Sequence, residues 1–146
     1  MSFNKQQGFT LIELVMVIVI LGILAATALP KFVDMTSSAR KSTLQGLAGA
    51  IQGAKSLTRA GYLILPAATV TLSDGTTVAV VTTTGAVNTG WPLATAPGIR
   101  AAVDISSDFT TTYAVTPNVA TFTIKTGCSL TYTESTGDVA LSTGSC

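Results

Sequence analysis

The chain has 146 residues, enough for one domain. Only 10% of its residues are charged, against roughly 25% in ordinary soluble domains, and its net charge of +1 gives no electrostatic reason to expect nucleic acid as a partner. Because it contains no histidine, Ser-His-Asp and Cys-His catalysis are excluded and the commonest metal ligand is missing. No other acid–base or nucleophile constellation can be named, so we predict that the chain is not an enzyme and holds no metal or cofactor.

The first predicted element is an apolar helix from Phe9 to Leu29. Its 21 residues would span ~31 Å, which matches the hydrocarbon core of a bilayer. One interpretation is an ordinary secretory signal peptide, with Lys5 as its basic start and Ala26-Thr27-Ala28 as its cleavage site. The other is a permanent membrane anchor. Glu13, a carboxylate inside the apolar run, is a poor match to a signal peptide.

A second, amphipathic helical stretch follows Pro30. Its stripe of largely apolar residues recurs at helical spacing and consists of Val33, Leu44, Leu47, Ile51, Ala54 and Thr58. We expect this stretch to continue the first helix and to run to about Ala60, with Gly61 as its stop. Pro30 lacks a backbone donor and clashes with the preceding turn, so a bend or local opening is predicted between Gly22 and Pro30.

The later part of the chain is predicted to be β-rich. The segment "AATVTLSDGTTVAVVTTT" alternates β-forming residues around Asp74-Gly75, a strong hairpin signal. Pro97 suits the first turn of a short helix through "PGIRAAVDI". Four short strands are predicted at "TTTYAVT", "VATFTIK", "CSLTYTE" and "DVALST". The expected fold is α+β, with an antiparallel sheet packed on the apolar stripe of the long helix.

Several polar residues allow a functional interpretation, but each also has a simpler one. Asp104 and Asp108 lie four residues apart, yet without further oxygen ligands they indicate solvated acids rather than a calcium site. Trp91 is interpreted as closing the edge of the core rather than as a ligand platform. The helix cations are interpreted as its solvated face, with DNA binding or subunit contacts as alternatives; they are Arg40, Lys41, Lys55 and Arg59.

The two cysteines, Cys128 and Cys146, allow two interpretations. They are either buried reduced thiols or, in a domain exported to an oxidising compartment, a single bridge. A bridge closing ~19 residues would stabilise the fold by roughly 3 kcal/mol in the loop-entropy model.

The stretch "GFTLIELVMVIVILGILAATALP" resembles the N-terminus of type IV pilins and their pseudopilin relatives. In that family a prepilin peptidase cuts after the glycine that ends a short leader, and it methylates the new amino terminus. The resemblance therefore implies cleavage between Gly8 and Phe9, an N-methylated Phe9, and a helix that is retained in the mature protein. This is a third interpretation of the apolar segment.

The resemblance also implies a division of the chain. Its parts are a leader at residues 1–8, a transmembrane and fibre-core helix at 9–30, an amphipathic helix of the head at 31–61 and a β-rich head at 62–146. A disulfide loop between Cys128 and Cys146 would resemble the arrangement in many true type IV pilins. A narrower similarity, in "LGILAATALPKFVDMTSSARKSTLQGLAGAI" and "GIRAAVDIS", is to major pilins of the mannose-sensitive haemagglutinin type, which promote surface attachment.

The implied function is the major structural subunit of an extracellular helical fibre of a Gram-negative bacterium, used in adhesion and biofilm formation. The implied partners are further copies of the chain, the prepilin peptidase and methylase, the assembly machinery, the inner membrane before assembly, and a surface or glycan ligand. Glu13 would specify docking register by pairing with the amine of Phe9. Alternatives are a pseudopilin or minor pilin of a type II secretion or pilus-assembly system, and a secreted binding module released by signal peptidase at Ala28.

Overall fold

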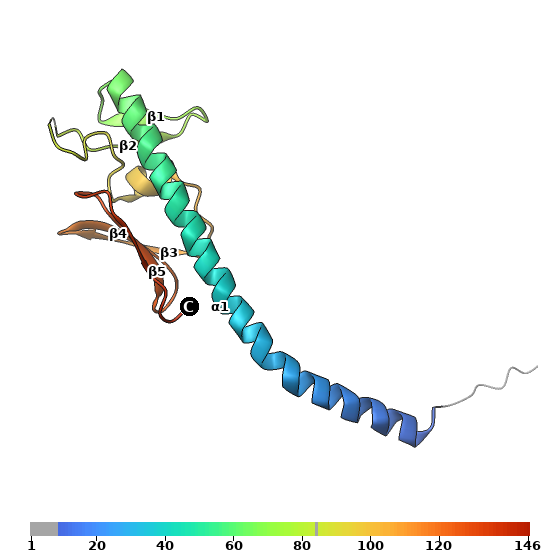
Figure 1. The fold of residues 1–146 in the computed structure, drawn as a ribbon. Coiled ribbons are helices and arrows are strands. Elements are labelled where there is room, and N and C mark those ends of the chain that lie inside the picture. Colours follow the sequence, from blue (N-terminus) through green and yellow to red (C-terminus); the bar gives the residue numbers. More distant parts are fainter. Residues whose placement is uncertain (1–8, 84) are drawn as a thin grey trace, which may run out of the picture. The chain divides into compact units, whose positions relative to one another are not determined.

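The computed structural model describes residues 9–83 and 85–146, and for residues 29–34 it describes the backbone alone. The chain divides into two compact units, Met1–Ser37 and Ser38–Cys146. A single helix, α1 (Leu11–Ile64), contributes residues to both (Figure 1). The α+β class predicted from the sequence is confirmed.

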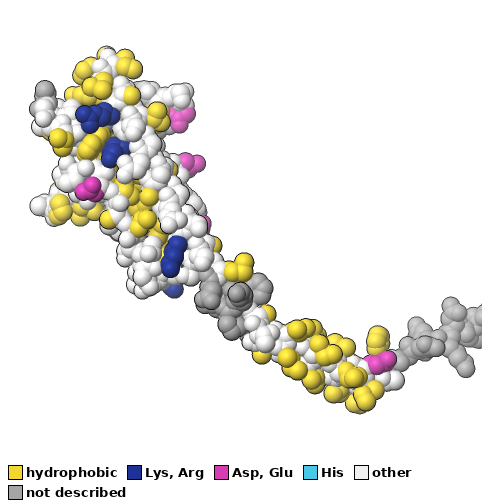
Figure 2. Space-filling view, in the orientation of Figure 1, with side chains coloured by type: hydrophobic (Ala, Val, Ile, Leu, Met, Phe, Trp, Pro, Cys, Tyr) yellow, Lys and Arg dark blue, Asp and Glu magenta, His cyan; other side chains and the backbone are white. Residues whose placement is uncertain are grey.

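In the first unit, α1 begins with a segment that is apolar on every face apart from Glu13. This segment, Leu11–Ala28, has a mean hydropathy of 2.7 and is long and apolar enough to cross a membrane. None of these 18 residues is buried in the structure, and Figure 2 shows apolar side chains along the segment. A helix that is apolar all round needs lipid or other helices around it. The helix includes Gly22 and Pro30, and the bend predicted between them stays a prediction.

The predicted end of α1 at Ala60, with Gly61 as a stop, is wrong, because the helix continues to Ile64. Gly61 has a packing role instead. A Cβ added there would lie 2.5 Å from a methyl carbon of Val70, so glycine makes room for that side chain. The helix ends shortly before Pro66, whose ring disfavours helical geometry in the residue before it.

The second unit contains the predicted strands. β1 (Thr69–Thr71) and β2 (Thr77–Ala79) pair antiparallel around the Asp74-Gly75 turn, where Gly75 has a φ of 84°. A four-stranded antiparallel sheet has the order β3-β4-β5-β6. Its strands are β3 (Thr110–Val115), β4 (Asn118–Lys125), β5 (Cys128–Thr133) and β6 (Val139–Ser142). The predicted short helix is η1 (Ala96–Arg100), a five-residue π-helix with Pro97 in its first turn.

The core of this unit lies between α1 and the four-stranded sheet. Leu44 and Ile51 of the predicted stripe are fully buried, and they belong to one cluster with residues of the sheet. The sheet contributes Ala120, Phe122, Cys128, Leu130 and Tyr132. Burying each large apolar side chain stabilises the fold by ~1.5–3 kcal/mol. The predicted packing of sheet on helix is confirmed, apart from Val33, whose side chain lies outside the described residues.

Truncating Ile51 should therefore destabilise the unit. Ile51→Ala is expected to lower the free energy of unfolding by about 2–5 kcal/mol, because it leaves a cavity under the sheet. Leu57→Ala is the matched control on the same helix: Leu57 is 66% exposed, and its loss should cost less than about 0.5 kcal/mol. Denaturant unfolding of the detergent-solubilised chain, followed by Trp91 fluorescence, measures both. Equal losses would contradict the assignment of the core.

Candidate functional site in the apolar segment

Thr10 and Glu13 form a reciprocal cap at the start of α1. The backbone N–H and the hydroxyl of Thr10 both donate to Oε2 of Glu13, each at 2.8 Å. The backbone N–H of Glu13 donates in return to the hydroxyl oxygen of Thr10 at 3.3 Å. This is a capping box, in which Thr10 precedes the first helical residue and Glu13 is the third residue of the helix.

The cap means that Glu13 is not an unpartnered acid in an apolar run. Its charge lies at the helix N-terminus, where the macrodipole favours an anion. Sequence reasoning missed this role, although the Thr-x-x-Glu spacing is a recognised signal for a capping box. The other carboxylate oxygen, Oε1, accepts none of these hydrogen bonds and is free to meet an external donor.

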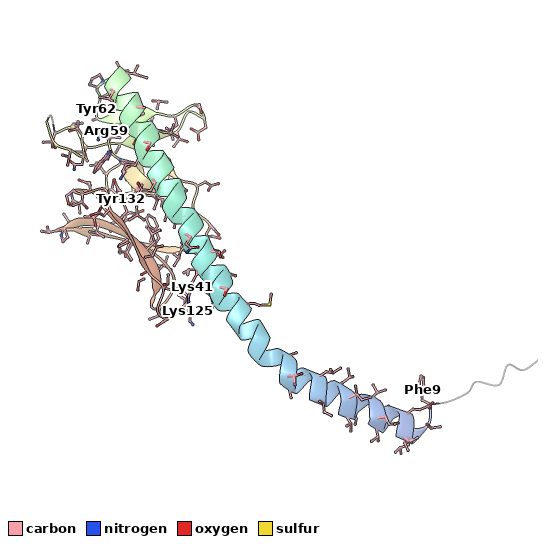
Figure 3. The ribbon with its side chains drawn as sticks, in the orientation of Figure 1. Phe9, Lys41, Arg59, Tyr62, Lys125 and Tyr132 are labelled. Atoms are coloured by element: carbon pink, nitrogen blue, oxygen red, sulfur yellow. A yellow bond between two sulfur atoms is a disulfide. The ribbon has the colours of Figure 1, made fainter. Side chains whose placement is uncertain are left out.

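Apolar residues of the first turns lie beside Glu13. A hollow of about 300 Å³ is lined by Phe9, Glu13, Leu14, Val17 and Ile18. The structure thus brings together two of the predicted site residues, Phe9 and Glu13. Phe9 is 91% exposed just before the helix (Figure 3). Gly8, the other residue of the predicted cleavage junction, lies outside the described residues.

Cys128 and Cys146 form a disulfide, and no cysteine among the described residues is free. Both are buried, and the bridge joins the first residue of β5 to the last residue of the chain. Arg40 of α1 donates to the main-chain oxygen of Cys146 at 3.0 Å. The C-terminal residue is therefore held both to the sheet and to the helix.

Two of the helix cations, Arg40 and Lys55, are half-buried rather than part of the solvated face that the sequence suggested, whereas Arg59 is exposed. Arg40 binds the main-chain oxygen of Cys146, and Arg59 donates to the carbonyl of Val87 at 3.0 Å. Lys55 donates to the carbonyl of Gly137 at 2.9 Å and lies 4.6 Å from the centre of the Trp91 ring. The long stems of these side chains lie along the surface, and this places their charged ends on main-chain oxygens.

The cation–π contact with Lys55 covers part of Trp91, which is half-buried. A position for Trp91 at the edge of the core stays a prediction, because its observed neighbours are the Lys55 ammonium group and Gly137. Among the described residues, no group of three or more potential ligands could hold a metal ion, and Asp104 and Asp108 are exposed.

Two buried polar residues in β5 and just after it organise the loop before η1. Glu134 accepts hydrogen bonds from the backbone of Ala94 at 2.8 Å and from Asn118 at 3.0 Å. The hydroxyl of Tyr132 donates to the carbonyl of Pro92 at 2.9 Å, and burial raises the pKa of Tyr132. Sequence reasoning missed Glu134, although the inward alternation of β5 continues to that position.

The capping box generates a prediction about the first turn of α1. Thr10→Val removes the hydroxyl and should speed hydrogen exchange at the amide of Glu13 by about 2- to 30-fold, the equivalent of a lost N-cap worth ~0.5–2 kcal/mol. Thr10→Ser should retain slow exchange, because serine keeps the hydroxyl. NMR of the chain in detergent micelles measures the rates. Thr27→Val, a control whose hydroxyl bonds to the carbonyl of Leu24, should leave Glu13 unchanged.

Comparison with known proteins places the apolar segment in a family. Residues 3–29 match the family described as "Prokaryotic N-terminal methylation motif". The chain is 50% identical over 50 residues to the type IV narrow pilus major component PilA5 of Thermus thermophilus, covering 34% of this chain and 43% of that protein. It is 52% identical over 58 residues to the type IV major pilin protein PilE of Neisseria gonorrhoeae, covering 40% of this chain and 33% of that protein.

The fimbrial protein EcpC of Eikenella corrodens is 53% identical over 51 residues, which cover 35% of this chain and 33% of that protein. The chain thus spans less than half the length of these relatives. No solved structure matches it significantly. The N-terminal segment of the chain thus contains a prokaryotic methylation motif and is similar to the corresponding segment of type IV pilins.

Proposed function

We propose that the chain is cleaved between Gly8 and Phe9 and polymerises, through its apolar helix, into an extracellular type IV pilus. The observation that carries this proposal is the geometry of Glu13. A single carboxylate is held at the start of a helix that is otherwise apolar on every face and exposed along Leu11–Ala28. The match to the methylation motif and the names of the relatives support it.

In this proposal, two environments cover the apolar surface of the helix, first lipid and then other helices. The precursor stores it in the inner membrane, where a charged group near the helix end remains within reach of water. Its cost there falls below the ~2.5–3.5 kcal/mol found for charged groups at a helix centre. In the fibre, the helices of neighbouring copies replace the lipid. Non-closing head-to-tail contacts between copies then generate a helical filament.

Cleavage supplies Glu13 with a cation. It creates a positive amine on Phe9, and Phe9 and Glu13 line the same hollow. Thr10 keeps its peptide N–H after the cut, so the capping box persists and continues to hold Oε2, while Oε1 remains available for an amine of the same or a neighbouring chain. Burying that carboxylate unpaired among apolar helices is expensive, so pairing disfavours misaligned subunits. Buried polar groups are known to set register in helical assemblies.

In the finer proposal the chain is a major pilin of the mannose-sensitive haemagglutinin type, used in surface attachment. Its partners are the prepilin peptidase and methylase, the assembly machinery and the inner membrane of a Gram-negative bacterium. A pseudopilin or minor pilin is the second candidate, since the same N-terminal segment serves those proteins. Abundance in sheared surface material separates them, because a major pilin dominates that material.

The mature N-terminus tests the proposal directly. The chain in sheared surface fibres should begin at Phe9 and carry one additional methyl group on its amine. Intact mass and N-terminal sequencing of that material measure both features. A chain that begins at Leu29 would instead identify an ordinary signal peptide and refute the fibre.

Substitutions at Glu13 separate its charge from its cap. Glu13→Gln retains a capping acceptor and loses the charge, whereas Glu13→Ala loses both. If pairing with the Phe9 amine sets the register, both variants should lower the yield of sheared fibre by about tenfold or more, because an unpaired buried charge costs several kcal/mol. Immunoblots of membranes should show normal insertion and cleavage. Wild-type amounts of fibre from Glu13→Gln would show that the cap, and not the charge, is what assembly needs.

A further inference from the structure

Three cations gather at one end of the second unit, and we call Arg40, Lys41 and Lys125 the basic end. Arg40 donates to the main-chain oxygen of Cys146, and the disulfide joins Cys146 to Cys128. Cys128 lies directly opposite Lys125 in the register of β4 and β5. This series of contacts places Lys125 at the same end of the unit as Arg40 and its neighbour Lys41.

Two of the three cations of the basic end have no partner among the described residues of the second unit. Lys41 and Lys125 are exposed (Figure 3). Within the described part of the chain, neither ammonium group has a hydrogen bond or an ion pair. Asp108, two residues before β3, accepts a hydrogen bond from Ser106 at 2.9 Å and pairs with neither lysine. The two ammonium groups therefore remain available to a partner.

Acidic groups line a cavity elsewhere in the same unit, which we call the acidic cavity. Its volume is about 410 Å³, and its polar lining includes Asp74, Thr76, Arg100 and Asp104. The backbone N–H of Thr76 donates to Asp74 at 2.8 Å and lowers the pKa of that carboxyl group, which is therefore ionised at neutral pH. With two carboxylates and one guanidinium, the lining has an excess of negative charge.

The Asp74 side of the acidic cavity lies toward the opposite end of the unit from the basic end. Asp74 is in the turn between β1 and β2, and Val70 of β1 packs on Gly61 near the end of α1. Gly61 follows Lys41 by twenty residues, which corresponds to about 30 Å along a helix. Figure 1 shows β1 and β2 beside the last turns of α1 and the C-terminus beside the earlier turns of the same unit.

We infer that the acidic cavity of one copy receives the basic end of another copy, so that opposite charges join successive second units in the fibre. This inference rests on the proposed function and adds a contact outside the apolar helix. Two different surfaces of one chain form a heterologous contact, which repeats without closing. Complementary charge guides such docking and penalises wrong orientations.

The shape and chemistry of the two surfaces support a second copy as the partner. A lysine side chain is a flexible stem with a compact charge, which can enter a cavity lined by carboxylates. An anionic membrane would account for the basic end but leaves the acidic cavity unexplained. The lysines and carboxylates of the two surfaces are exposed to solvent, where salt screens charges beyond roughly 8 Å at physiological ionic strength. Added salt should therefore weaken the contact.

Charge reversal in the full-length chain tests the inference. One variant combines Lys41→Glu with Lys125→Glu, a second combines Asp74→Lys with Asp104→Lys, and a third contains all four changes. Each of the first two should give several-fold less sheared fibre, and the third should recover most of the yield, because the charges are complementary again. Asp138→Lys, an exposed acid between β5 and β6, is the control and should leave the yield unchanged.

The outcomes separate this inference from the proposed function. Wild-type fibre yield from the first two variants would overturn the inference and leave the pilus intact, whereas no fibre from the unmodified chain would refute the pilus itself. No recovery in the third variant overturns the complementary contact. If the lysine variant loses binding to phosphatidylserine vesicles but gives a normal yield of sheared fibre, the basic end binds a membrane instead. If a charge reversal prevents folding, neutral variants replace it: Lys41→Gln with Lys125→Gln, and Asp74→Asn with Asp104→Asn. In these variants, fibre dissociation that no longer depends on salt concentration supports the contact. Salt dependence equal to that of the unmodified fibre overturns it.

Discussion

The exposure of an entirely apolar helix, with one capped carboxylate at its start, is the constraint on which the rest of this protein depends. Along Leu11–Ala28 no side chain is buried by the chain itself, so the segment needs lipid or other helices. Thr10 holds one oxygen of Glu13 and leaves the other available. An apolar surface alone would allow copies to slide, whereas a charge that needs a partner favours one alignment.

The same helix has a different role in the second unit, where one stripe of it completes a core. Ile51 and the residues that share its face pack against the sheet. Polar contacts at the edges of this core tie irregular segments to regular ones: Lys55 holds the turn at Gly137, and Glu134 holds the segment at Ala94. The disulfide and Arg40 hold the C-terminal residue. These contacts thereby hold the irregular segments and the C-terminal residue in place against the sheet and the helix.

This arrangement also gives the second unit two chemically distinct ends. The exposed lysines have no partner within the described chain, and the acidic cavity has more carboxylates than cations. In the proposed fibre, where other copies would bury the apolar helix, such surfaces would remain available for contacts between heads. The apolar helix would supply most of the association energy, and the charged ends would supply orientation, because screened surface charges contribute specificity more than affinity.

The sequence alone determined the elements with a strong local signal: the apolar run, the helical stripe, the hairpin at Asp74-Gly75 and the four alternating strands. Periodicity and turn chemistry are properties of neighbouring residues, so they can be identified before folding. Tertiary structure decided the rest. The rule that glycine ends helices predicted a stop at Gly61, but the helix continues past it, and Val70, nine residues later, packs where a side chain would be. Lys55 and Glu134 have partners 82 and 40 residues away. Such contacts depend on how the segments pack together, and no local pattern of residues specifies that packing.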